Sequence, residues 1–216
     1  MHLLHLDSSA RREGFSRRLS ARYAEAWRAA HPDGRYTYRD LVAEPVPCID
    51  EAWTQICDIV LAEGITDPQR LADVPRTYAQ RRAWKVVEPL LTELVDADEL
   101  LLGVPMYNYS VPASLKAWID QVTFPRARLD ARVVVAGARG GSYGPGTPRE
   151  PFDHHERYLR DFLAGHFGIH TVRFLTVEMV NALIDPTLAG FRELHEASLA
   201  AAWEAAAWEA AGGDVQ

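Results

Sequence analysis

Residues 105–109 read Pro-Met-Tyr-Asn-Tyr and directly follow a continuous apolar run from Leu100 to Val104. An unbroken apolar run of this kind is typical of a strand that is buried on both faces of a parallel sheet. In open α/β sheets, ligands bind outside the carboxyl ends of the strands. Because the segment brings two aromatic rings, a thioether and a side-chain amide to such a place, it predicts a site for a flat molecule.

A second candidate segment, residues 8–18, follows the strand-like run His2–Leu6. It supplies hydroxyls, guanidinium groups and the start of a helix, which together favour a phosphate. Its spacing is not that of a Walker loop. The alternative is that Ser16 only caps the helix and that the arginines after it are solvated.

A third segment ends the strand-like run Arg132–Ala138, where Arg139 is followed by Gly140 and Gly141. Glycines let backbone amides approach a ligand without a Cβ in the way, although a plain turn would use them too. No G-x-G-x-x-G follows the first strand, which disfavours a tightly bound dinucleotide but leaves room for a transient nicotinamide. We therefore expect three loops to meet in one site at a common edge of the sheet.

The hydrophobic pattern alternates strands with helices along the chain. The predicted strands are 2–6, 36–41, 100–104, 132–138 and 171–178. The predicted helices are 16–30, a stretch beginning at 49, 76–97 with an interruption at Pro89, one after Tyr109 capped by Ser110, one ending near 167, and 186–211. Residues 64–75 are expected to form a surface loop. Such alternation implies right-handed crossovers, so we expect one α/β domain over residues 1–216, with a doubly wound five-stranded parallel sheet and helices on both faces.

The composition excludes several classes of protein. The 216 residues carry a formal net charge of −7, so no global field attracts nucleic acid or an anionic membrane. No apolar run approaches the roughly 18 residues of a membrane span. The two cysteines lack the spacing of a disulfide framework or a zinc site, which suits a reducing cytoplasm. The histidines near residues 153–170 lack H-E-x-x-H spacing, so we expect solvated or ligand-edge histidines and no bound metal.

The three segments resemble those of the FMN-dependent NADH-azoreductase family, within the flavodoxin-like quinone reductases. Members of that family are similar in having a Ser-Ser-rich phosphate loop, which here is residues 6–16. They carry a Pro-Met-Tyr-Asn-Phe/Tyr segment, here residues 105–109, and a Ser-Arg-Gly-Gly loop, here residues 138–141. The resemblance covers nearly the whole chain, and the middle motif is the specific one.

The resemblance implies a bound FMN, with NADH or NADPH as the transient electron donor. It implies an enzyme that reduces quinones, azo compounds or related aromatic acceptors by ping-pong two-electron (hydride) transfer through the flavin, with no catalytic side chain required. The implied cofactor contacts are Ser9, Ser16, Arg17 and Arg18 at the phosphate, and Pro105, Met106, Tyr107, Asn108, Tyr109, Ala138, Arg139, Gly140 and Gly141 along the ring. The implied substrate contacts are Tyr143 and Phe124.

Three departures from the family pattern are visible. Ala138 replaces the family's serine, Arg17 and Arg18 follow Ser16 where the family has Ser-x-Ser, and residues 121–131 are shorter than the family's flap. We therefore expect a pocket that is more open or is completed by a partner. Family members are typically homodimers with the flavin at the subunit boundary, and the resemblance makes Trp53, Tyr78 and Trp118 the candidate subunit contacts here. Two alternatives stay open: a biosynthetic flavin reductase for one natural product, and a non-enzymatic flavodoxin-like electron carrier or binding module.

Overall fold

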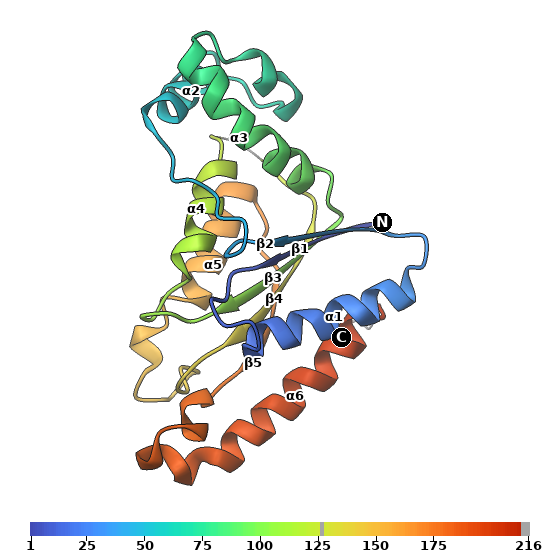
Figure 1. Ribbon diagram of the computed structural model, residues 1–216, viewed down its shortest axis with the longest axis vertical. Coiled ribbons are helices and arrows are strands. Elements are labelled where there is room, and N and C mark those ends of the chain that lie inside the picture. The colour runs from blue at the N-terminus through green and yellow to red at the C-terminus, as the bar shows by residue number, and fades with distance from the viewer. Residues whose placement is uncertain (126–127, 213–216) are drawn as a thin grey trace.

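Five parallel strands form one sheet in the order β2-β1-β3-β4-β5 (Figure 1). The strands are β1 (His2–Asp7), β2 (Arg35–Asp40), β3 (Glu99–Pro105), β4 (Arg132–Ala138) and β5 (Val172–Val177). The structure, a computed structural model, describes residues 1–125 and 128–212. This strand order is that of a flavodoxin-like doubly wound sheet and confirms the predicted fold class.

Helices connect successive strands, and α6 follows the last strand. The α-helices are α1 (Phe15–Ala30), α2 (Glu51–Ala62), α3 (Tyr78–Val95), α4 (Ala113–Val122), α5 (Glu156–Phe162) and α6 (Arg192–Ala210). Short helical segments are η1 (Pro68–Asp73), η2 (Glu150–Phe152), η3 (Leu163–Phe167), η4 (Val180–Leu183) and η5 (Pro186–Phe191). Within the described ranges, no helix combines the length and the apolar character that crossing a membrane requires.

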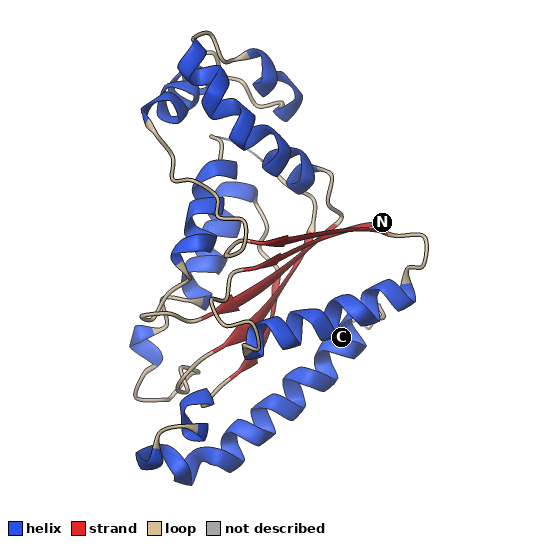
Figure 2. Ribbon diagram, in the orientation of Figure 1, coloured by secondary structure: helices blue, strands red, loops and turns tan. Residues whose placement is uncertain are grey.

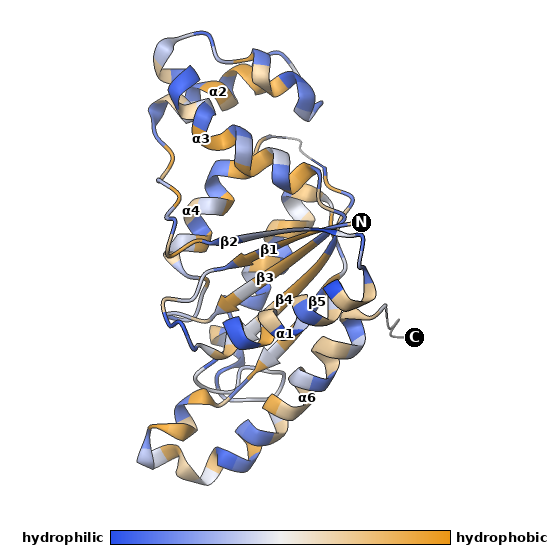
Figure 3. Ribbon diagram, turned by 45° about the vertical axis from the view of Figure 1, so that its right-hand side comes forward, coloured by the Kyte–Doolittle hydropathy of each residue, from blue (hydrophilic) through white to orange (hydrophobic). Residues whose placement is uncertain are grey.

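Both faces of the sheet are covered by helices (Figure 2). On one face α1 packs against α6, and Trp27 and Ala206 join the same buried cluster. On the other face α3, α4 and α5 contribute Leu94, Trp118 and Leu159 to a second cluster. Because strands covered on both faces must be apolar on both, β3 and β4 are predominantly hydrophobic (Figure 3).

The segment from α2 to α3 packs on itself at one end of the molecule (Figure 1). Asp50 caps α2 by accepting a hydrogen bond from the backbone of Trp53, at 2.9 Å. Thr77 and Gln80 form a capping box that begins α3. Apolar side chains from α2, η1 and α3 then bury Phe124 among them.

Several local expectations differ from the structure. The predicted cap at Ser110 is wrong, because α4 begins at Ala113 and the Ser110 hydroxyl donates instead to the carbonyl of His154, at 3.1 Å. α3 runs through the exposed Pro89 without a break. Residues 64–75, expected to be a loop, contain η1, and the predicted helix 186–211 divides into η5 and α6.

Candidate functional site

The loop after β1 leads into a helix start that lacks a side-chain cap. α1 begins at Phe15, and Gly14 at its N-cap makes no side-chain hydrogen bond. Ser16 lies inside the first turn, where its hydroxyl is fully buried and has no hydrogen-bond partner in the described chain. A Cβ on Gly14 would lie 2.8 Å from the Ser9 hydroxyl, so this approach requires glycine. Unpaired helix N–H groups beside an unpaired hydroxyl form a site for an anion.

Residues 107–110 form a two-residue hairpin after β3. The amide of Tyr107 donates to the carbonyl of Ser110 at 2.9 Å, and the amide of Ser110 donates back at 3.0 Å. The central residues Asn108 (φ 49°) and Tyr109 (φ 69°) are both left-handed, as a type I′ turn requires. Tyrosine rarely adopts this conformation, so the turn holds strain of about 1 kcal/mol. The Tyr107 hydroxyl accepts from the amide of Ala10 at 3.2 Å, which ties the hairpin to the loop after β1.

A buried arginine anchors the loop after β4. The Arg139 side chain is 3% exposed, and its guanidinium pairs with Asp153 at 3.2 Å, with Glu178 at 3.5 Å and with Glu156. The Glu178 carboxylate also accepts from the Ser142 hydroxyl at 2.6 Å and from a backbone amide of the same loop. Three carboxylates therefore neutralise this guanidinium and fix the path of the loop.

These loops line one cavity of about 490 Å³. Its lining brings together most of the predicted contacts: Ser9, Ser16, Pro105, Met106, Tyr107, Asn108, Tyr109, Ala138, Arg139, Gly140 and Tyr143. The segment after β5 completes the lining with Val180, Asn181, Leu183 and Ile184, which no motif predicted. Asn181 lies so close that its Nδ2 would be 2.6 Å from a Cβ on Gly140, and its backbone N–H donates to the Gly140 carbonyl at 3.1 Å. Only its place after a fifth parallel strand could have indicated this segment.

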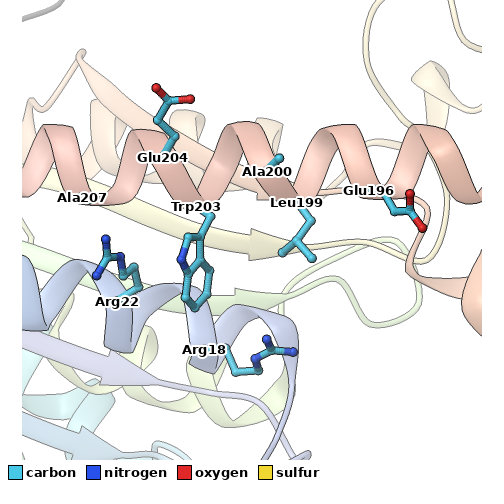
Figure 4. A pocket seen from close by; sticks show the side chains of 8 residues that line it. All are labelled: Arg18, Arg22, Glu196, Leu199, Ala200, Trp203, Glu204 and Ala207. Atoms are coloured by element: carbon cyan, nitrogen blue, oxygen red, sulfur yellow. The ribbon is translucent and has the colours of Figure 1, made fainter.

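The two arginines after Ser16 point away from the cavity. The Arg17 guanidinium pairs with Asp40 at 2.7 Å and donates to the Ser9 carbonyl at 2.8 Å. Its hydrogen bond lowers the pKa of Asp40 to about 2. Arg18 lies on the outer face of α1, where Arg18 and Arg22 flank Trp203 of α6 at 5.9 and 6.0 Å from a ring centroid (Figure 4). Neither Arg17 nor Arg18 lines the cavity.

Three other predicted contacts also lie outside the cavity lining. Phe124 is 1% exposed and packs against Trp53 in the α2–α3 cluster, so its position does not support a substrate contact. Gly141 follows the lining residue Gly140, but Arg149 covers it. Trp118, predicted as a subunit contact, is buried in the core under the sheet.

His155 differs from the expected solvated or ligand-edge histidine because it is fully buried. Burial, assisted by the nearby Arg139 cation, lowers the pKa of His155 to about 4. Its ring is therefore neutral at physiological pH. Across residues 1–125 and 128–212, no three His, Cys, Asp or Glu side chains gather in a way that could hold a metal ion.

A family model described as having a flavodoxin-like fold matches residues 1–200. The chain belongs to this flavodoxin-like family. One relative of this flavodoxin-like protein is the FMN-dependent NADH:quinone oxidoreductase of Nocardia farcinica, which is 60% identical over 199 residues covering 92% of each chain. Another, of the same name, comes from Frankia casuarinae and is 43% identical over 93% of this chain and 94% of the relative. The resemblance predicted from the three segments is thereby confirmed.

Solved structures show the same fold. The azoreductase AzrA superposes with a TM-score of 0.79 at 21% identity, covering 98% of this chain and all of the azoreductase. An FMN-dependent NADH-azoreductase from Bacillus anthracis, solved in complex with FMN, has a TM-score of 0.74 at 16% identity, over 97% of this chain. At these identities the superpositions show that the flavodoxin-like chain shares the architecture of these proteins.

Proposed function

We propose that this protein is an FMN-dependent NADH:quinone oxidoreductase that also reduces azo compounds or related aromatic acceptors. The observation that carries the proposal is the buried, unpartnered hydroxyl of Ser16, which lines the same cavity as the hairpin at Asn108 and Tyr109. A buried hydroxyl without a partner costs free energy unless a ligand satisfies it. The relatives at 60% and 43% identity support the choice of FMN, NADH and quinone as the three ligands.

The lining residues fit FMN by their chemistry. Ser9, Ser16 and the first N–H groups of α1 would hold its phosphate. The amide N–H of Gly140 donates to no acceptor within the described ranges, so it is free for the polar edge of a flavin ring. Donors at that edge would stabilise the negative charge of a reduced ring.

Aromatic side chains form the wall of the cavity beside these donors. The ring of Tyr109 contacts those of Tyr143 and Phe152, with centroids 6.2 and 5.4 Å apart. This wall offers a stacking surface and excludes water from one side of a bound ring. When bound there, FMN supplies hydride transfer between NADH and the aromatic acceptor. The protein's own side chains bind and orient, and none of them needs to act as a general acid or base.

Anaerobic stopped-flow spectroscopy tests the proposal. The purified protein, supplied with FMN, is mixed first with NADH and then with menadione, while the flavin absorption is followed. We expect rapid bleaching by NADH and rapid recovery with menadione. A protein that does not bind FMN would refute the proposal, and bound FMN that neither NADH nor NADPH reduces would favour the electron-carrier alternative.

We also propose that the protein is a homodimer whose partner covers the mouth of the cavity. Large apolar side chains of the lining, Leu183, Ile184 and Tyr109, are exposed, as is Phe152, which packs against Tyr109. An exposed apolar area of this kind is typical of an interface. Light scattering on an eluting size-exclusion peak should give twice the chain mass, and Ile184→Asp should give the mass of one chain. A wild-type monomer would contradict the proposal.

Cytoplasmic location is a further part of the proposal. Cys48 and Cys57 are both free thiols, which suits a reducing compartment. The proposed electron donor, NADH, would come from the same compartment. Fractionation of cells that produce the protein would test the location directly, and recovery outside the cytoplasmic fraction would contradict it.

A further inference from the structure

The side chains of two arginines in the cavity lining have no ion-pair or hydrogen-bond partner among the described residues. Arg11 belongs to the loop after β1, and Arg149 belongs to the loop after β4. Both are exposed, and neither side chain makes an ion pair or a hydrogen bond within the described part of the chain. Arg139 differs from them because three carboxylates neutralise it. The acidic residue in the lining is Glu13, on the α1 side.

The two free arginines lie beside different parts of the cavity. Nη1 of Arg149 lies 3.0 Å from the position that a Cβ on Gly141 would occupy, and the ring of Tyr143 lies 3.5 Å from the same position. β3 separates β1 from β4, and neighbouring strands are about 4.8 Å apart, so the two loops leave the sheet roughly 10 Å from each other. Arg11 therefore neighbours the anion site at Ser9, whereas Arg149 neighbours the aromatic wall.

The part of the cavity beside Arg149 and Tyr143 differs in its chemistry from the phosphate site. The FMN of the proposed function carries one phosphate, which the start of α1 would hold, so Arg149 would stay a free cation after the cofactor binds. A planar guanidinium next to an aromatic surface suits a flat ring that bears a carboxylate, sulfonate or phosphate group. A neutral ring of the same size would gain the stacking surface but not the charge interaction.

We propose that Arg149 makes the cavity selective for planar aromatic molecules that carry an anionic group. The inference rests on the proposed function, because it concerns the molecule that enters the cavity beside the flavin. The anionic group has two possible sources: a sulfonate or carboxylate on the electron acceptor, and the pyrophosphate of the nicotinamide donor. Because the side chain is exposed, the selectivity should weaken as the salt concentration rises.

Equilibrium dialysis of the FMN-loaded, oxidised protein tests the proposal without requiring turnover. The probes are anthraquinone-2-sulfonate, the neutral 2-(hydroxymethyl)anthraquinone, and redox-inert tetrahydro-NAD. In Arg149→Gln, the preference for the sulfonate over the neutral quinone should fall roughly five- to ten-fold, and Arg149→Glu should reduce it further. Arg149→Lys should keep part of the preference because it keeps the charge.

Arg157→Gln is the matched control. Arg157 is also exposed and without a partner in the described ranges, but it lines a different cavity. A change confined to the sulfonate would assign the anionic group to the acceptor, a change confined to tetrahydro-NAD would assign it to the donor, and a loss with both would show that Arg149 binds both. The proposal is overturned if Arg149→Gln alters the binding of the two anionic probes no more than Arg157→Gln does. Turnover of the wild type with NADH and the neutral quinone is measured separately, so a failure of the proposed function would be recognised as such.

Discussion

Replacing Ser16 with alanine should have opposite effects on the stability of the apo-protein and on its affinity for FMN. The Ser16 hydroxyl is fully buried and unpartnered. Burying an unsatisfied hydroxyl costs about 1–3 kcal/mol, so its removal should raise the free energy of unfolding of the apo-protein by about 1 kcal/mol. A hydrogen bond from the same hydroxyl to a phosphate is worth about 1.5–3 kcal/mol, so the Kd for FMN should rise roughly 10- to 150-fold.

Ser20, one turn further along α1, provides the matched control. It is equally buried, but its hydroxyl donates to the Asp7 carboxylate at 2.9 Å. Ser20→Ala should therefore destabilise the protein by about 1–3 kcal/mol, because it leaves a buried carboxylate short of one donor. Ser20 does not line the cavity, so the Kd for FMN should change far less than in Ser16→Ala.

Urea unfolding of both apo-variants gives the free energy of unfolding. A titration that follows the quenching of FMN fluorescence gives the Kd for FMN. Opposite signs of the stability change in Ser16→Ala and Ser20→Ala are expected, together with weakened FMN binding in Ser16→Ala alone. An anion site at the start of α1 is ruled out if Ser16→Ala binds FMN within two-fold of the wild type, or if it destabilises the apo-protein as Ser20→Ala does.

Three further predictions concern the residues that support the site. His155 titrates near pH 6.5 in the unfolded chain but at about 4 in the fold, so the free energy of unfolding falls as the pH drops through that window, by up to about 1.4 kcal/mol per pH unit. His155→Leu should remove roughly 1–2 kcal/mol of the loss between pH 6.5 and 5, as urea unfolding at several pH values would show; an unchanged pH profile would contradict this. Tyr107→Phe deletes the acceptor of the Ala10 amide and should cost less than about 1 kcal/mol of stability while weakening FMN binding, so unaltered FMN affinity would deny the link between the two loops. In Gly103→Ala the new Cβ would lie 1.9 Å from Oδ1 of the buried Asp7, so a loss of at least about 2 kcal/mol is expected on urea unfolding, and a loss below 0.5 kcal/mol would show that the carboxylate is free to move.

The sheet could be predicted because its signals are local and strong. The apolar runs of β3 and β4 match the predicted strands to within a residue or two, since strands covered on both faces must be apolar on both. The first residues of the helices were harder to predict from the sequence. Ser16 and Ser110 are residue types that favour helix caps, yet Gly14 and Pro112 occupy the cap positions. Ser16 lies inside the first turn of α1, and the Ser110 hydroxyl donates to the carbonyl of His154.

The site could be predicted where its residues follow a strand directly. Ser9, Asn108 and Gly140 line one cavity because the exits of β1, β3 and β4 lie side by side. Contacts between side chains that are far apart in the sequence could not be predicted in the same way. Arg17 is adjacent to Ser16 in the sequence, but Asp40, at the end of β2, holds its guanidinium away from the cavity. Likewise Asn181 carries no motif, and only the register of β5 brings it against Gly140.

The left-handed turn at Asn108 and Tyr109 also bears on the kinetics of ligand entry. The energetic penalty of that turn is met when the chain folds, so this edge of the cavity is preorganised before any ligand arrives. Association then requires no backbone isomerisation at this edge, and its rate should be governed by diffusion and desolvation. The strained turn therefore lowers the free energy of unfolding, and it keeps the backbone at this edge of the cavity in one conformation.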